Sequence, residues 1–528
     1  MKLRTIVKIA ITSSVVLLCS GFALYSYFKL SATQERKKID LYTLVPLSAS
    51  AVFATDDVAT FVTGVDGLAC SKNNHFLYIS KIFSYLKQYL YTFLDGTPHG
   101  SSREMSQVLI SFHEPDNDRN QVLYCRLGTG DRELVNNFVQ KYISVGYPPK
   151  AFVYKGESIM IYTMVDGGFL ACYMTPDFLV LSCQIKLVEE VINVYKGGKS
   201  LSSDLAFRQL QVSNKSNAIA TLFTRVTGLM GWTKFDMKLK ENFIYFSGAC
   251  RDVDSSFSFI NMLSKQEVLE GFPGEYLPST TYYFSRQSVV NWDSLLSLEH
   301  VSDTRKEMSV AADVLASNKI FSTYLMENAG NNMLACLFYE NDTTGRQAEV
   351  LSIPVFDIER AEKNLRYWVS SVSAKLIDNN EAGRITLHYT PDRAYSIYKL
   401  PLTTLFNRLS GFIEPSLQIY AVFYRGTLLL APNINSLSSY IDYLDKKNIL
   451  YNESSYRVVV DGLSDSYNFM LMTDFSRLLP DSQFHVRYVP SFFLRNSDFF
   501  SHFIMFVQLT CTDGLIYPNI VLKYKADE

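Results

Sequence analysis

One stretch of the chain places a histidine among carboxylates. Residues 110–121 read ISFHEPDNDRNQ, so that His113 is followed by Glu114, Asp116 and Asp118. Imidazole and carboxylate groups could bind a metal ion here, or they could supply the acid and base of a hydrolase. A calcium-binding EF-hand loop does not fit, because its sixth and twelfth positions require glycine and glutamate, and the chain has Gln121 and Leu127 there.

The other chemical motifs of the sequence are incomplete. KGGKS at 196–200 resembles the end of a phosphate-binding loop, but Asn193 stands where the motif needs its first glycine, and a predicted helix precedes it. No two histidines lie three or four residues apart, and the eight cysteines form no Cys-x-x-Cys pair. We therefore predict no catalytic residues, no metal site and no cofactor, and expect that the protein is not an enzyme.

The second part of the chain repeats the pattern of the first. Residues 178–208 align without gaps on 427–457, and their apolar positions coincide, as expected for a strand followed by a helix in both copies. This repetition predicts two tandem related domains, residues 41–268 and 269–528.

The repeat weakens the chemical interpretation of the histidine stretch. The stretch aligns with CLFYENDTTGRQ, which begins at Cys336, so that Glu114 falls on Glu340 while His113 falls on Tyr339. Proline, aspartate, asparagine and glycine in both segments favour turns between strands. We therefore predict a hairpin loop, with Glu114 and Glu340 as a shared carboxylate at a strand end.

Two more pairs of polar residues fall on equivalent positions of the copies. Aligning FIYFSGACRD with IMFVQLTCTD places Asp252 opposite Asp513, and the longer alignment places Arg208 opposite Arg457. Each arginine follows a carboxylate by four residues, which predicts a short capped helix with acid and base on one face. The alternative is an arginine that binds a ligand.

Hydrophobic periodicity sets the expected fold class. Residues 76–94 repeat apolar side chains every three or four positions, which predicts an amphipathic helix, and 233–248 alternate apolar and charged residues as in a half-buried hairpin. We predict an α+β protein, with an N-terminal transmembrane anchor followed by two tandem domains of mainly antiparallel sheets and helices packed on one side of them.

The N-terminus begins with a short basic tail, residues 1–8, followed by an uncharged run, residues 9–28, and a charged linker, residues 29–40. Twenty residues at about 1.5 Å each span the hydrocarbon core of a bilayer, so 9–28 is predicted to be a transmembrane signal anchor that contacts the membrane. A cleaved signal peptide and a lipoprotein acylated at Cys19 are the alternatives. All three place the bulk of the chain outside the cytoplasm.

The anchor, the strand openings LVP and YLP and the duplicated strand–helix plan resemble an uncharacterised family of bacterial membrane-anchored envelope proteins of unknown function. The resemblance implies an inner-membrane anchor with the C-terminal bulk in the periplasm, and it implies no chemistry.

The copies differ most in an insertion at 490–501, which carries Phe492, Phe493, Phe499 and Phe500. These rings could fill a local core, or they could form an exposed apolar patch that contacts a partner.

The net charge of −2 at pH 7 gives no basic field for nucleic acid. The leading hypothesis is a binding or scaffolding module with an envelope protein as its partner. The alternatives are a protein that binds or helps transport a small molecule or lipid in a cleft between the repeats, and a hydrolase with a dispersed site.

Overall fold

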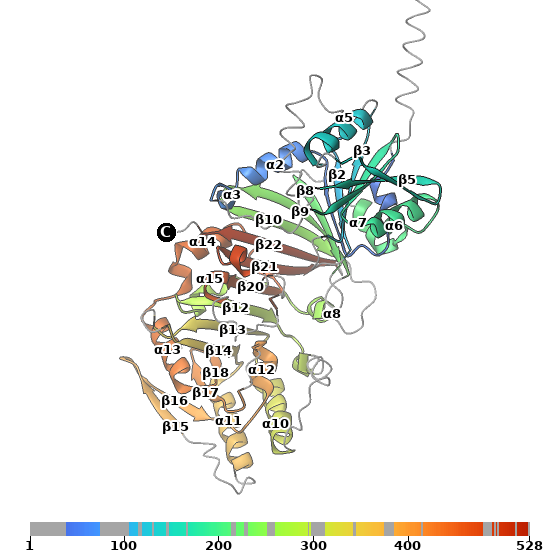
Figure 1. The fold of residues 1–528 in the computed structure, drawn as a ribbon. Coiled ribbons are helices and arrows are strands. Elements are labelled where there is room, and N and C mark those ends of the chain that lie inside the picture. The colour runs from blue at the N-terminus through green and yellow to red at the C-terminus, as the bar shows by residue number, and fades with distance from the viewer. Residues whose placement is uncertain are drawn as a thin grey trace, which may run out of the picture.

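The computed structural model shows a long antiparallel sheet with helices on both faces (Figure 1). The structure describes residues 39–73, 105–113, 119–128, 131–143, 147–164, 167–212, 218–225, 231–250, 259–293, 295–296, 312–341, 345–373, 385–412, 416–478, 488–489, 493, 496–512 and 515–525. The helix predicted over 76–94 lies outside these residues.

In the part of the chain that the structure describes, no helix is both long and apolar enough to cross a membrane. This finding corrects the predicted fold class, which began with a transmembrane anchor at 9–28. That segment and the predicted tail, 1–8, lie outside the described residues, as does all but the end of the linker, 29–40. The expectation of mainly antiparallel strands with helices agrees with the structure.

The first unit, residues 41–250, contributes ten strands of the sheet. In sheet order they are β4 (Lys150–Tyr154), β5 (Glu157–Thr163), β6 (Phe169–Met174), β7 (Phe178–Ser182), β3 (Gln121–Arg126), β2 (Val108–Phe112), β1 (Ala51–Thr55), β8 (Ala220–Arg225), β9 (Trp232–Lys240) and β10 (Phe243–Cys250).

The second unit, residues 273–524, repeats this order with ten strands. They are β15 (Ile385–Tyr389), β16 (Ala394–Lys399), β17 (Tyr420–Tyr424), β18 (Thr427–Ala431), β14 (Gln347–Pro354), β13 (Asn332–Tyr339), β12 (Thr281–Ser288), β20 (Phe469–Asp474), β21 (Phe503–Thr512) and β22 (Leu515–Tyr524). A separate two-stranded sheet joins β11 (Leu269–Glu270) to β19 (Ser466–Tyr467).

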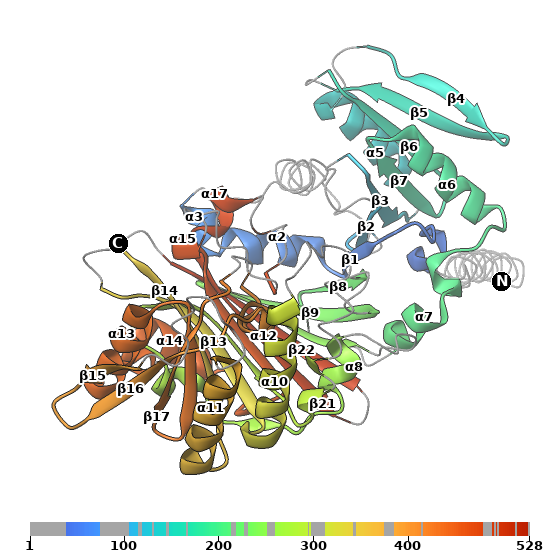
Figure 2. The same ribbon diagram turned by 90° about the horizontal axis from the view of Figure 1, so that it is seen from below.

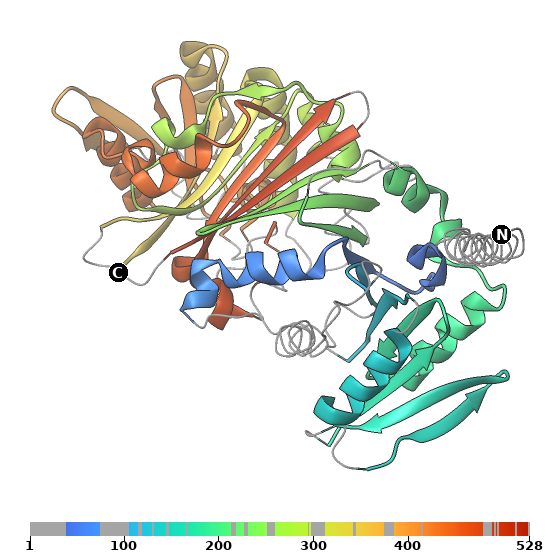
Figure 3. The same ribbon diagram turned by 90° about the horizontal axis from the view of Figure 1, so that it is seen from above.

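The two units meet through their last strands. β10 pairs antiparallel with β22, with Phe243 opposite Lys523 and Ser247 opposite Asn519, so that the units form one continuous 20-stranded sheet. The end strands β4 and β15 therefore lie at opposite ends of the molecule (Figures 2 and 3). The predicted domain boundaries, 40/41 and 268/269, stay predictions.

The strand order also changes one sequence alignment. β10 and β22 are each the last strand of a unit, and β9 and β21 each precede them. The sequence comparison instead placed Cys250 of β10 opposite Cys511 of β21. The alignment therefore slipped by one strand, because neighbouring hairpin strands share the same alternation of apolar and polar residues.

Helices cover both faces of the sheet rather than the single face expected. In the first unit the helices are η1 (Leu41–Leu44), α2 (Val58–Asp66), α3 (Ala69–Lys72), α5 (Asp131–Phe138), η2 (Val139–Ile143), α6 (Ile185–Tyr195), η3 (Leu201–Ser203) and α7 (Leu205–Val212), and α8 (Phe259–Leu263) follows them. In the second unit they are η4 (Pro273–Tyr276), α10 (Ala312–Asn328), α11 (Ile358–Ser373), α12 (Leu405–Ser410), α13 (Ile434–Asp445), η5 (Leu450–Asn452), α14 (Ser454–Val460), α15 (Phe475–Leu478) and α17 (Ser497–Phe500).

Each unit therefore has two hydrophobic cores, one on each face of its sheet. In the second unit, α10, α11 and α12 pack on one face, and α13 and α14 pack on the other (Figure 1). In the first unit, α6 and α7 lie opposite α2 and α5. Strands with both faces covered are almost wholly apolar, as in MLACLF of β13, since neither face meets water. The core beneath α10 continues across the β10–β22 junction to Cys250 and Leu68.

Gly248 lies on β10 beside this junction, where a larger side chain has no room. A Cβ there would lie 2.7 Å from a ring carbon of Phe235 and 2.9 Å from the carbonyl oxygen of Lys234. We expect Gly248→Val to lower the free energy of unfolding by about 1–3 kcal/mol, measured by urea denaturation. Ser247→Val on the same strand, at an exposed position, is the control. Equal stability of the two variants would contradict the predicted clash.

Candidate functional site

His113 follows β2 and binds a serine at each ring nitrogen. Ser48, in the loop before β1, places its Oγ 2.9 Å from Nδ1, and Ser111 of β2 places its Oγ 2.9 Å from Nε2. The contacts continue outward from both serines. Ser48 Oγ donates to Glu190 Oε2 of α6 at 2.9 Å, and Ser111 Oγ lies 3.1 Å from the hydroxyl of buried Tyr124 on β3.

The order of donors in this chain of contacts places a proton on Nδ1 of the histidine. Because the Ser48 hydroxyl donates its proton to Glu190, it accepts the Nδ1–H of His113. We assign the proton on Nδ1 from these contacts. In the neutral ring, Nε2 accepts a hydrogen bond from Ser111, whose own oxygen accepts one from Tyr124. Burial lowers the pKa of His113 to about 4, which favours the same neutral form.

The cluster differs from a serine hydrolase triad in the position of its carboxylate. In a triad, the acid binds the imidazole nitrogen that faces away from the nucleophile. Here Glu190 binds the serine, and both imidazole nitrogens bind hydroxyl groups. A histidine with a pKa near 4 is also a weak base at neutral pH. The contacts instead tie three elements together: the loop before β1, the end of β2, and α6.

The carboxylates that the sequence placed beside His113 are not part of this cluster. Glu114, Asp116 and Asp118 lie outside the described residues. Among the residues that are described, no three side chains of the metal-binding types gather at one place. The predicted hairpin is present, since the His113 amide donates to the Asn120 carbonyl across the turn.

The equivalent hairpin of the second unit has a different polar group. The amide of Glu340 donates to Arg346 O, as His113 donates to Asn120 O, so the structure places Glu340 rather than Tyr339 at the position of His113. The Glu340 side chain is 10% exposed, and its Oε2 lies 3.4 Å from Arg346 Nε. The cluster of His113 is thus specific to the first unit.

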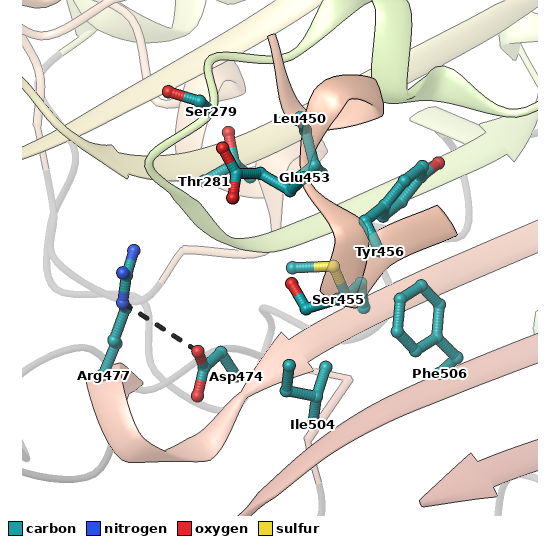
Figure 4. Close-up of a pocket in the computed structure, with 11 residues that line it drawn as sticks. Ser279, Thr281, Leu450, Glu453, Ser455, Tyr456, Asp474, Arg477, Ile504 and Phe506 are labelled. Atoms are coloured by element: carbon teal, nitrogen blue, oxygen red, sulfur yellow. Dashed lines mark ion pairs between the residues drawn. The ribbon is translucent and has the colours of Figure 1, made fainter. Parts of the chain in front are cut away.

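A small pocket lies in the second unit between β12, β20, β21 and the start of α14 (Figure 4). Its volume is about 60 Å³, which is enough to admit water. Asp474 lies at one side, 3.9 Å from Arg477 Nε and 3.0 Å from Lys525 Nζ. The buried hydroxyl of Thr281 has no hydrogen-bond partner within the described residues. The pocket is lined by Ser279, Thr281, Leu450, Glu453, Ser455, Tyr456, Met472, Asp474, Arg477, Ile504 and Phe506.

Three phenylalanines of the insertion at 490–501 fill a local core. Phe500 is buried, and Phe493 and Phe499 pack against the same core. The ring centroids of Phe493 and Phe500 lie 4.6 Å apart, and those of Phe499 and Phe500 lie 5.0 Å apart. Phe492 lies outside the described residues. These contacts correspond to the core alternative rather than to an exposed patch.

The shared arginines, Arg208 and Arg457, are exposed on short helices. α7 begins after Asp204, whose carboxylate accepts the Phe207 amide at 3.1 Å, so Asp204 caps the helix. No ion pair joins either arginine to its carboxylate among the contacts that the structure describes. Asp252 and Asp513 lie outside the described residues.

One exposed element was missed by the sequence interpretation. β15, with the sequence ITLHY, is an end strand of the sheet and pairs only with β16 within the described chain. Ile385, Leu387 and Tyr389 are 50%, 49% and 71% exposed. His388 points to the other face, where its Nε2 lies 2.9 Å from Asp442 of α13. The signal in the sequence was a strand with apolar residues at alternate positions and no lysine, glutamate or aspartate.

Comparisons with known proteins give similarity without an activity. A family model described as "Protein of unknown function (DUF3352)" matches residues 105–241. No curated protein matches the chain. Crystal form I of TP0453 is 9% identical, with a TM-score of 0.26, over 42% of this chain and 83% of that one. Crystal form III of TP0453 is 11% identical, with the same TM-score of 0.26, over 44% of this chain and 88% of that chain. The chain is thus similar, over residues 105–241, to a family of unknown function.

Proposed function

We propose that this protein is a non-enzymatic module of the bacterial cell envelope, on its extracytoplasmic side, that binds or scaffolds a second protein chain of that compartment. The observation that supports this proposal is the exposed end strand β15. It carries three apolar side chains in water at the end of a sheet whose other described strands, apart from β4, have neighbours on both sides.

The backbone of β15 is arranged to accept another strand. The amide of Thr390 donates to Arg393 O at 2.9 Å, so residues 390, 388 and 386 direct their backbone groups toward β16. By alternation, Ile385, Leu387 and Tyr389 direct theirs away from the sheet. A strand whose outward groups have no partner strand within the described residues is a template for another strand, as in recognition by β-strand addition.

The apolar side chains of β15 add to this template. Ile385, Leu387 and Tyr389 project on one face, because alternate residues of a strand share a face. Ile385 lies opposite Tyr398, whose hydroxyl donates to Glu362 of α11, so this is the α11 face. Large exposed apolar side chains on an end strand mark an interaction site.

The other end strand, β4, also exposes Phe152 and Val153, at 40% and 67%, but it carries a lysine. Lys150 begins β4, and Lys155 follows it in the turn to β5. Lysines on an end strand oppose pairing with a second strand, because the added strand would desolvate the charge. β15 has no lysine among its residues, so it is the better docking strand.

The alternative functions have less support in the geometry. The pocket of about 60 Å³ is too small for a lipid, and it lies within the second unit rather than between the units. The units meet through the β10–β22 ladder. The polar cluster at His113 lacks the order of a hydrolase triad.

Photo-crosslinking in cells tests the proposal. A photoreactive phenylalanine analogue replaces Leu387 on β15 in one variant and Val458 in a control variant. Val458 is 55% exposed on α14, far from the end strand in sequence. We expect a defined adduct from position 387 that position 458 does not give. Equal labelling from both positions, or none from either, would count against β15 as the binding strand.

A further inference from the structure

We infer that the occupant of β15 is β15 of a second copy of this chain, paired antiparallel about a twofold axis. This inference rests on the proposed function, because it names the partner of the same strand. It predicts a closed dimer in which the sheets of two copies become continuous through their β15 strands.

The residues of β15 are complementary to themselves in one register. With Leu387 opposite Leu387 of the second copy, Ile385 faces Tyr389 and Thr386 faces His388. All six large apolar side chains then lie on one face at the centre of the extended sheet. No two lysines, arginines or carboxylates of β15 lie opposite one another, so no like-charge pair opposes the contact.

The backbone favours the same register. The residues whose backbone groups point away from the sheet are Ile385, Leu387 and Tyr389. In the register centred on Leu387, each outward residue faces an outward residue of the second copy. Each outward N–H group therefore donates to the outward C=O group of the facing residue. The Cα atoms of such a hydrogen-bonded pair are about 5.5 Å apart.

The chain already contains a junction of this kind. β10 and β22, which are equivalent strands of the two units, pair antiparallel from Phe243–Lys523 to Cys250–Ile516. In the proposed dimer, β15 pairs antiparallel with β15 of the second copy, as β10 pairs with β22 within the chain. A twofold contact uses the same strand of both copies, so it closes after two copies instead of extending into a filament. One strand pair is a small interface, so we expect a weak, micromolar dimer.

The first experiment measures the mass of the purified full chain by sedimentation velocity over a range of concentrations. We expect reversible dimerisation and, for Leu387→Lys, a dissociation constant raised by at least about tenfold, because two ammonium groups then lie opposite one another. Leu205→Lys is the matched control, since Leu205 is 61% exposed on α7. It should dimerise like the unaltered chain.

The second experiment reads the register by disulfide formation. Leu387→Cys should form a covalent dimer on mild oxidation, because a Cα separation of about 5.5 Å suits a disulfide. A mixture of Ile385→Cys and Tyr389→Cys should also crosslink, whereas Leu205→Cys should not. This readout does not depend on whether the lysine variant folds.

The outcomes separate the inference from the proposal beneath it. A chain that stays monomeric at all concentrations, with no disulfide at position 387, overturns the second-copy inference. If the photo-adduct at 387 then has a mass other than twice that of the chain, β15 still binds a partner, and the proposed function stands. If position 387 gives no photo-adduct either, the second-copy inference and the proposed function both fail.

Discussion

Replacement of Trp368 by alanine should lower the free energy of unfolding by about 3–5 kcal/mol. Trp368, on α11, is 2% exposed, and its ring stacks on Phe321 of α10 with centroids 4.7 Å apart and planes 5° apart. Tyr324 lies 6.2 Å from it on the same helix as Phe321. Removal of the indole leaves a cavity between the two helices that cover one face of the second unit, since the rigid sheet beneath cannot fill it.

Urea denaturation followed by circular dichroism measures this loss. The neighbouring residue gives a matched control, because Tyr367 is 76% exposed on the same helix. Tyr367→Ala should change the free energy of unfolding by less than about 0.5 kcal/mol. If the two variants lose equal stability, the aromatic stack is not a main source of the packing between α10 and α11.

The stability of the folded chain should depend on the protonation of His113. Burial holds the pKa of His113 at about 4, below the value of about 6.5 expected in the unfolded chain. Between these two values the unfolded chain binds a proton that the folded chain does not. The contribution is therefore fully present above pH 6.5 and is lost as the pH falls toward 4, by about 3 kcal/mol in total.

The His113→Gln variant isolates this contribution. The difference in free energy of unfolding between the unaltered chain and His113→Gln, measured from pH 7.5 to pH 4, cancels the titration of all other groups. We expect the free energy of unfolding of the unaltered chain to fall relative to that of His113→Gln as the pH falls below 6.5. A difference that is constant with pH would show that His113 is not held in its neutral form by the fold.

The sequence predicted the local elements of this protein well. The gapless alignment of 178–208 on 427–457 corresponds to β7 followed by α6 and to β18 followed by α13. The turn chemistry after His113 predicted a hairpin, and the structure closes it by the His113–Asn120 hydrogen bond. Both signals are local, because they depend on periodicity and on turn residues within a few positions.

The contacts between distant segments could not be predicted in this way. Ser48 and Glu190 lie 142 positions apart, so their contact depends on how β1, β2 and α6 assemble. Helices on both faces were missed because a short amphipathic segment shows which side of itself is apolar, and not which face of a sheet it covers. The exposure of β15 was missed for the same reason, since alternation does not show whether a strand lies at the end of a sheet.

The junction of β10 with β22 also bears on how the chain is made. β10 ends at residue 250, and its partner strand begins about 265 residues later, at position 515. At a synthesis rate of about 5–20 residues per second, the free side of β10 waits on the order of tens of seconds for β22 to be translated. During that interval the nascent first unit presents an unpaired strand. A chaperone that covers β10 should therefore improve the yield of folded chain more than one that acts after release.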